Sequence, residues 1–365
     1  MKKVLFTVIA VLSISNALVF GMYGNNNDWI DFLTDGNQFR ARMDQLGFTL
    51  GNNTIKGTFG FRANTGYLGS ILSSSDNDFT LDATISAGIA YTSSLISIGI
   101  GYNYTYAGIS EDFALADKKL DIHTPVLAVN ALDNNLRIVV PVQIAITDKL
   151  YGSEDYTHKG ISLDPQIRYY SDSDIFKEFR LTLKYGTVET TAKGDAVSKY
   201  NSSSFGFDFR LYFGAVVGNV SLLPFIKVTY DTSLGAKGKT LGSYEVYSDS
   251  VIIPMNTGAN LLERETYQLS ILPTLGLEAS SDIVTLYMEP GLGYSIIDNG
   301  LKGSSLTHAL AWSAYTELYI TPVEDLEWYF EMDINGDYAP NGNSIPVYFE
   351  TTTGITWYLP SFGNE

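Results

Sequence analysis

Charged side chains occur at alternate positions in two separate stretches of this chain, with bases in the first stretch and acids in the second. If the two stretches form consecutive strands of one cylinder, a basic wall and an acidic wall would face each other across its lumen. Such a transverse field could orient dipolar solutes in a water-filled pore, as in a porin. Salt bridges that fill a closed lumen, or charges that solvate its rims, explain the same residues equally well. The bases are Lys56, Arg62, Arg137, Arg168, Arg180, Lys184, Arg210 and Lys227, and the acids are Glu278, Glu289, Glu317, Glu327, Glu331, Asp333 and Glu350.

The sequence offers little for catalysis or for binding a metal or a cofactor. It contains no cysteine, which excludes disulfides and thiolate metal sites, and its three histidines are not spaced as metal ligands. His158 lies close to Glu154 and Asp155 and is the best catalytic candidate, although a solvated loop histidine is the simpler interpretation. No phosphate-binding loop or nucleophile elbow is found. We therefore expect that the protein is not an enzyme and needs neither a cofactor nor a metal.

The segments that carry the charged residues alternate in the way that β-strands do. Between residues 96 and 106, isoleucine and tyrosine take the even positions, while serine, glycine, asparagine and threonine take the odd ones. Successive side chains of a strand point to opposite faces, so such a strand has one apolar face and one small or polar face. Many of the segments reach the roughly 9–11 residues that a tilted strand needs to cross a bilayer. A sheet that faces lipid must close on itself, because every backbone N–H has to be paired. The sequence therefore predicts an all-β, antiparallel transmembrane β-barrel.

The connections between the predicted strands alternate between short and long, as periplasmic turns and outer loops do in outer-membrane barrels. Strands counted from residues 54–62 to residues 347–358 number about 14, which is the count we favour, and about 16 if residues 38–50 also pair. Residues 28–38 do not alternate and predict a short helix that lies under the barrel or plugs it, a strand extension being the alternative. The longest connection, residues 231–263, could fold inward as a constriction.

The N-terminus has the features of an export signal. Lys2 and Lys3 precede an apolar run, and small residues allow cleavage after Gly21 or Ala17. We therefore expect a signal peptide over 1–21, a periplasmic plug segment or first strand over 22–53, and an outer-membrane barrel over 54–359. The net charge of −17 argues against nucleic acid as a partner. The expected partners are outer-membrane lipid and, if the lumen conducts, small hydrophilic solutes.

Several N-terminal segments resemble the variable surface proteins of Brachyspira spirochaetes. They are residues 22–24 (MYG), 28–34 (DWIDFLT), 36–38 (GNQ), 40–48 (RARMDQLGF) and 55–62 (IKGTFGFR). The resemblance implies an abundant, immunogenic protein of the outer membrane, exposed at the cell surface, whose copies vary between strains. It also implies recognition by host antibodies and assembly into homo-oligomers, and it transfers no catalytic residue. An adhesin that binds host matrix through acidic outer loops is the alternative function, and a porin whose antigenicity is incidental is another.

Overall fold

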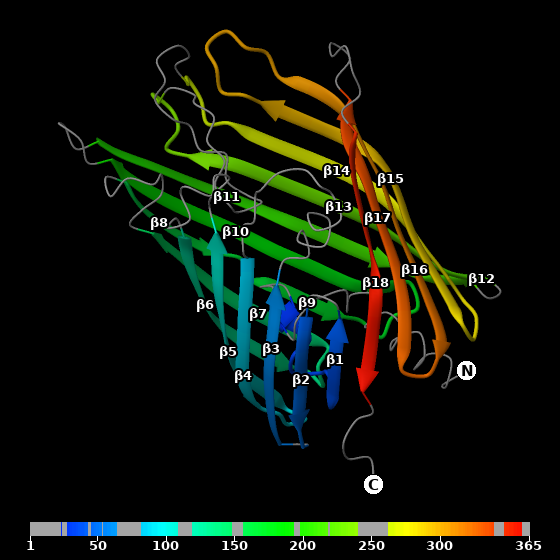
Figure 1. Cartoon of the computed structure of the whole chain (residues 1–365). Coiled ribbons are helices and arrows are strands. Elements are labelled where there is room, and N and C mark those ends of the chain that lie inside the picture. The colour runs from blue at the N-terminus through cyan, green and yellow to red at the C-terminus, as the bar shows by residue number, and fades with distance from the viewer. Residues whose placement is uncertain are drawn as a thin grey trace, which may run out of the picture.

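A computed structural model describes residues 23, 28–42, 45–52, 54–63, 82–108, 119–147, 156–192, 198–217, 220–239, 262–338 and 347–359. All the described strands belong to one antiparallel sheet, which closes because β1 pairs with β18. Figure 1 shows the closure, with the first strand beside the last. The elements are η1 Asp28–Asp31, β1 Gln38–Arg42, β2 Gln45–Gly51, β3 Ile55–Ala63, β4 Asp82–Tyr91, β5 Ile96–Gly108, β6 Lys119–Ala131, β7 Leu136–Thr147, β8 Tyr156–Leu163, β9 Gln166–Tyr170, β10 Phe176–Ala192, β11 Ser198–Phe213, β12 Ala215–Val217, β13 Val220–Leu234, β14 Tyr267–Ser280, β15 Val284–Asp298, β16 Thr307–Val323, β17 Leu326–Tyr338 and β18 Tyr348–Leu359.

Eighteen strand segments make sixteen positions in the barrel wall, since two positions are each shared by two segments. β8 and β9 both lie between β7 and β10, and they are separated at Pro165, which has no N–H to donate to a ladder. β11 and β12 both pair with β13 and are separated at Gly214. Sixteen is the larger of the two expected counts.

The two strands beyond the smaller count come from the predicted strand over residues 38–50. That segment is a hairpin and not one strand: β1 pairs with β2 from Gln38 opposite Thr49 to Arg42 opposite Gln45. β1 then pairs with β18 on its other side, with Arg40 opposite Tyr358. The hairpin supplies the additional strand that an even count requires, and its first strand closes the barrel.

The exterior of the barrel is apolar and its lumen face is small or polar. On β5, Ile100 is 60% exposed while Asn103 is 1% exposed, and the alternation predicted for this segment is present. Cross-strand partners share a face, so the lumen face can be followed from strand to strand around the closed sheet. An apolar band on the outside of a closed sheet suits lipid and not water. The chain is therefore an outer-membrane-type β-barrel.

One short helix, η1, precedes the barrel wall, as expected for residues 28–38. It has four residues, and three of them are buried. A helix of that length cannot hold itself together in water, so its order comes from packing against the wall. In the part of the chain that the structure describes, no helix has the length and hydropathy to cross a bilayer.

Candidate functional site in the barrel lumen

The N-terminal segment packs against the inner face of the barrel, and we call Tyr23 and residues 28–37 the lumen plug. Its apolar side chains Tyr23, Trp29, Ile30, Phe32 and Leu33 are buried. They form one cluster with small wall residues of β4, β6 and β7, namely Ala90, Val126, Ala128 and Val139. The centres of the Trp29 and Phe32 rings lie 5.3 Å apart in an edge-to-face arrangement. The plug is thus held mainly by its aromatic residues.

Glycines in the wall make room for the plug. A Cβ atom added to Gly101 would lie 2.3 Å from the Trp29 ring, and one added to Gly88 would lie 2.7 Å from it. The ring therefore rests directly on the backbone of β4 and β5. The indole Nε1 donates a hydrogen bond to Asn103 Oδ1 at 3.1 Å, which fixes the ring and satisfies its buried N–H. Glycines at these two positions are required by the close approach, not by backbone conformation.

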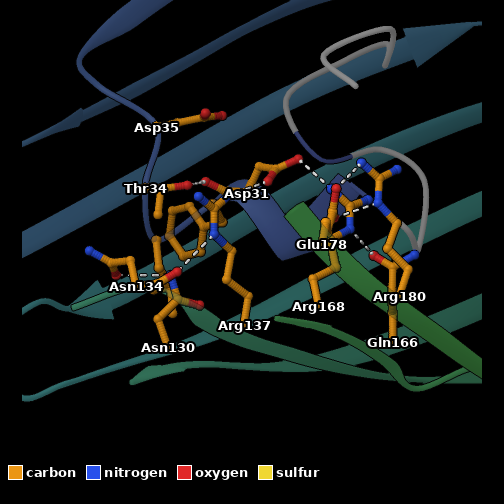
Figure 2. Close-up of polar contacts among 12 residues, drawn as sticks. Asp31, Thr34, Asp35, Asn130, Asn134, Arg137, Gln166, Arg168, Glu178 and Arg180 are labelled. Atoms are coloured by element: carbon orange, nitrogen blue, oxygen red, sulfur yellow. Dashed lines mark hydrogen bonds and ion pairs between the residues drawn. The ribbon is translucent and has the colours of Figure 1, made fainter. Parts of the chain in front are cut away.

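Polar contacts also hold the plug against the barrel wall, and Figure 2 shows those of Asp31. Asp31 lies between Arg137 and Arg168, with N–O distances of 2.7 and 3.6 Å. The Nζ of Lys56 donates to the backbone oxygens of Phe32 at 3.3 Å and Leu33 at 3.1 Å. The plug is therefore bound through its side chains and through the two backbone carbonyls that follow η1.

Another carboxyl of the plug, Asp35, makes a different set of contacts. Asp35 accepts a hydrogen bond of 2.6 Å from the Tyr23 hydroxyl. Burial, and then the neighbouring Asp31 carboxylate, raise the pKa of Asp35, whereas Arg40, Tyr23 and Lys56 lower it by smaller amounts. The plug thus carries one carboxylate that is matched by arginines and one whose ionised form is disfavoured.

Five of the eight predicted bases form a continuous row around the lumen. In the ladder Arg137 lies opposite Arg168, Arg168 opposite Arg180, Arg180 opposite Arg210, and Arg210 opposite Lys227. Like charges on neighbouring strands repel, so such a row needs counter-charges. The other three predicted bases lie outside it: Lys56 contacts the plug, Lys184 lies 3.7 Å from Asp231, and Arg62 lies at the end of β3.

Acids inside the basic row supply the counter-charges. Glu178 accepts two hydrogen bonds from Arg180, at 2.5 and 2.9 Å. Asp208 accepts two from Arg210, both at 3.0 Å, and lies 3.8 Å from Lys227. Each of these acids precedes its arginine by two residues and shares its face. The basic row is thus a set of ion pairs as well as a line of positive charge.

The predicted acids lie on β14 to β18, interleaved with tyrosines. In the ladder Glu278 lies opposite Tyr287, Tyr287 opposite Glu317, and Glu317 opposite Glu331. A second row runs from Glu289 through Tyr315 and Asp333 to Glu350, and Glu327 lies opposite Thr356. Tyr287 donates to Glu289, Tyr315 donates to Glu317 at 2.5 Å, and Tyr358 donates to Glu327 at 3.2 Å. We call Tyr287, Glu289, Tyr315, Glu317, Tyr319, Glu327, Tyr329, Glu331 and Tyr358 the tyrosine–glutamate wall.

The charged residues of the wall that the sequence analysis assigned to neither row include Arg40, Arg42, Glu178 and Asp208. The guanidinium of Arg42 lies 4.0 Å from the centre of the Tyr329 ring, and its Nε donates to Thr356 at 2.5 Å. The alternation of Gln38, Arg40 and Arg42 along β1 is the signal that could have identified the two arginines. Arg40 and Arg42 place two positive charges beside the acidic wall.

The remaining sequence predictions concern residues 231–263 and the histidines. Of the proposed constriction, residues 240–261 lie outside the described residues, and so do Glu154 and Asp155 beside His158. His158 is 1% exposed and lies within β8, not in a loop. His123 and His308 each contact a tyrosine hydroxyl on the exterior face, from Tyr102 and Tyr294. Within the described ranges, no three His, Cys, Asp or Glu side chains are grouped so as to hold a metal ion.

Comparisons with known proteins identify one family and several solved structures that are similar to the chain. A family model described as "Serpulina hyodysenteriae variable surface protein" matches residues 2–358. No curated protein matches the chain. Among solved structures, the chain is similar to the translocator domain of the autotransporter NalP from Neisseria meningitidis, with 14% sequence identity over 91% of each chain and a TM-score of 0.32.

Proposed function

The chain belongs to the Serpulina hyodysenteriae variable surface protein family, and we propose that it is a surface-exposed antigen of the outer membrane whose barrel also passes small hydrophilic solutes. Export would remove the signal peptide after Gly21 or Ala17. Its proposed partners are lipid around the barrel, host antibodies at the outer loops and further copies of the chain. We assign it no catalytic role.

The observation that carries the pore proposal is the charged lining of the lumen. Barrels with 16 strands are wide enough to leave an aqueous channel. Here a row of bases on β7 to β13 and rows of acids on β14 to β18 line different parts of one lumen. Charged rings and walls of this kind select and orient permeating ions and dipoles. The described contacts of the plug are with β2 to β9, so the plug narrows the lumen from one side.

Planar-bilayer recording on the purified protein tests conduction. We expect discrete conductance steps from the wild-type protein and larger or more frequent steps from the Trp29→Ala variant, whose plug is less firmly held. A heat-denatured sample is the control for contaminating channels. A protein that inserts but gives no steps in either form would refute the pore, whatever its role as an antigen.

Surface display needs a separate test, because it does not depend on conduction. Antibodies raised against the folded protein should bind intact cells as strongly as permeabilised ones. Binding only after permeabilisation would refute surface exposure. The adhesin alternative rests on acidic outer loops such as residues 231–263, which the structure describes only at their two ends.

A further inference from the structure

Two carboxylates face each other directly on the tyrosine–glutamate wall. Glu317 on β16 and Glu331 on β17 are cross-strand partners, and both belong to the lumen face. Side chains in such pairs start from Cβ atoms about 4.5–5.5 Å apart. Two ionised carboxylates at that separation repel each other unless a positive group lies between them.

Glu317 is one of the most deeply buried charged groups in the described chain, with 1% of its surface exposed. Its Oε1 accepts a hydrogen bond from Tyr315, but its Oε2 is buried and has no partner. The Oε1 of Glu331 is also buried without a partner, and the Tyr319 hydroxyl, buried beside these carboxylates, interacts with Glu317. Buried polar atoms are nearly always hydrogen-bonded, so two buried carboxylate oxygens without a donor indicate a missing donor.

Aromatic rings surround the same carboxylates. Tyr287 lies opposite Glu317 on β15, Tyr315 and Tyr319 flank it along β16, and Tyr329 lies opposite Tyr319. The faces of tyrosine rings attract cations. The Arg42 guanidinium already lies over the Tyr329 ring, which shows that this wall accepts a cation.

Charge on this part of the wall is not balanced. Arg40 and Arg42 of β1 lie beside it, with Arg40 5.9 Å from the Tyr358 ring and Arg42 over Tyr329. The wall carries four glutamates, namely Glu289, Glu317, Glu327 and Glu331, and Glu289 also interacts with Lys227 of β13. Two arginines and one lysine leave an excess of negative charge when all four glutamates are ionised.

We propose that Glu317, Glu331 and Tyr319 bind the primary ammonium group of a small organic amine in the lumen. A primary ammonium carries three N–H donors and no acceptor, so it can donate to the two carboxylate oxygens that lack a donor and to the Tyr319 oxygen, which can accept a hydrogen bond as well as donate one. The surrounding rings favour an organic cation. Calcium would require six to eight oxygen ligands, more than two carboxylates and a phenol supply. The site does not depend on conduction, because it requires only that the amine reach the lumen.

Calorimetric titration of the folded, full-length protein in detergent micelles with n-butylammonium chloride tests the site. We expect saturable binding of one amine per chain. Glu317→Gln and Glu331→Gln should each weaken it about tenfold or more, because a charge-assisted hydrogen bond is lost. The matched control is Glu278→Gln, an inward-facing glutamate of β14 whose carboxylate accepts from Ser280, and it should change the affinity less than about twofold.

Three results would overturn the proposal. One is the absence of binding to the wild-type protein, which would mean that the two carboxyls share a proton instead of an amine. Another is equal weakening by all three variants, which would indicate general attraction to an acidic wall. A third is equal heat from potassium or calcium chloride with the same dependence on Glu317, which would make the ligand a metal ion. Circular dichroism of each variant confirms that the β-barrel is retained.

Discussion

The inward positions 97, 99 and 101 of β5 are serine, glycine and glycine, whereas positions 315, 317 and 319 of β16 are tyrosine, glutamate and tyrosine. On β5 the wall contributes almost no side-chain volume, and the aromatic plug fills the space from another part of the chain. On β16 the wall fills the space with its own long side chains. The lumen beside β5 is thus filled by a separate segment of the chain, whereas the lumen beside β16 is filled by side chains of the barrel wall itself.

The two regions also differ in how well their polar groups are matched. On the plug side, Asp31 has two arginines, Glu178 has Arg180, and the Trp29 indole has Asn103. The Nη1 of Arg168 is buried without a hydrogen bond, but it lies 3.6 Å from the Asp31 carboxylate. On the tyrosine–glutamate wall, buried oxygens of Glu317 and Glu331 have no donor. Charged and polar groups that are paired with one another stabilise the docked plug. Buried carboxylate oxygens without a donor leave the tyrosine–glutamate wall able to bind a ligand that supplies one.

The largest expected effect is loss of the Trp29 ring from the plug. Trp29→Ala should destabilise plug docking by about 3–5 kcal/mol, because it removes a fully buried aromatic ring from a glycine-lined seat. The chain lacks cysteine, so Thr34→Cys gives a single reporter on the plug. We expect its labelling by a maleimide to accelerate about 100-fold or more in the Trp29→Ala background. Unchanged labelling would mean that the ring does not hold the plug in place.

A smaller effect is expected when the space for the Trp29 ring is filled by a wall side chain than when the ring itself is removed. Gly101→Ala places a Cβ 2.3 Å from the Trp29 ring, and such overpacking should cost roughly 1–3 kcal/mol of plug docking. Gly160→Ala is the matched control, since its Cβ would make only ordinary contacts, the nearest at 3.6 Å from Ala145. The same cysteine reporter should respond to the first substitution and not to the second. Equal labelling rates in the two variants would show that Gly101 is not needed to make room for the Trp29 ring.

The barrel, its lumen-facing parity and the short N-terminal helix follow from the sequence, because alternation and turn spacing are local properties. The location of the plug does not, because Trp29 and Asn103 are 74 residues apart and nothing near Trp29 indicates its partner. The same holds for the basic row, which requires the relative register of five strands. Alternation assigns Arg137 and Arg168 to a face, but only the ladder shows that they lie at the same level.

The strand count shows a further limit of the pattern. Residues 38–50 alternate well enough to resemble one strand, although they form two. β1 has only five residues, and two of its inward positions carry arginine, so it lacks the long apolar alternation of strands such as β5. The closing strand therefore has a weak local signal, and its pairing with β18 spans almost the whole chain.

The smallest expected effect is that of Glu331→Gln, and the same substitution in the basic row, Glu178→Gln, is its comparison. In amine-free buffer, Glu331→Gln should raise the free energy of unfolding by about 0.2–1 kcal/mol, because it removes a like-charge pair with Glu317. Glu178→Gln should lower the free energy of unfolding by roughly 1.5–3 kcal/mol, because it removes charge-assisted hydrogen bonds from Arg180. Urea unfolding in lipid vesicles, followed by tryptophan fluorescence, measures both. The opposite signs are the test: if both variants are destabilised, then Glu331 already has a stabilising partner, and the two walls do not differ in the way described.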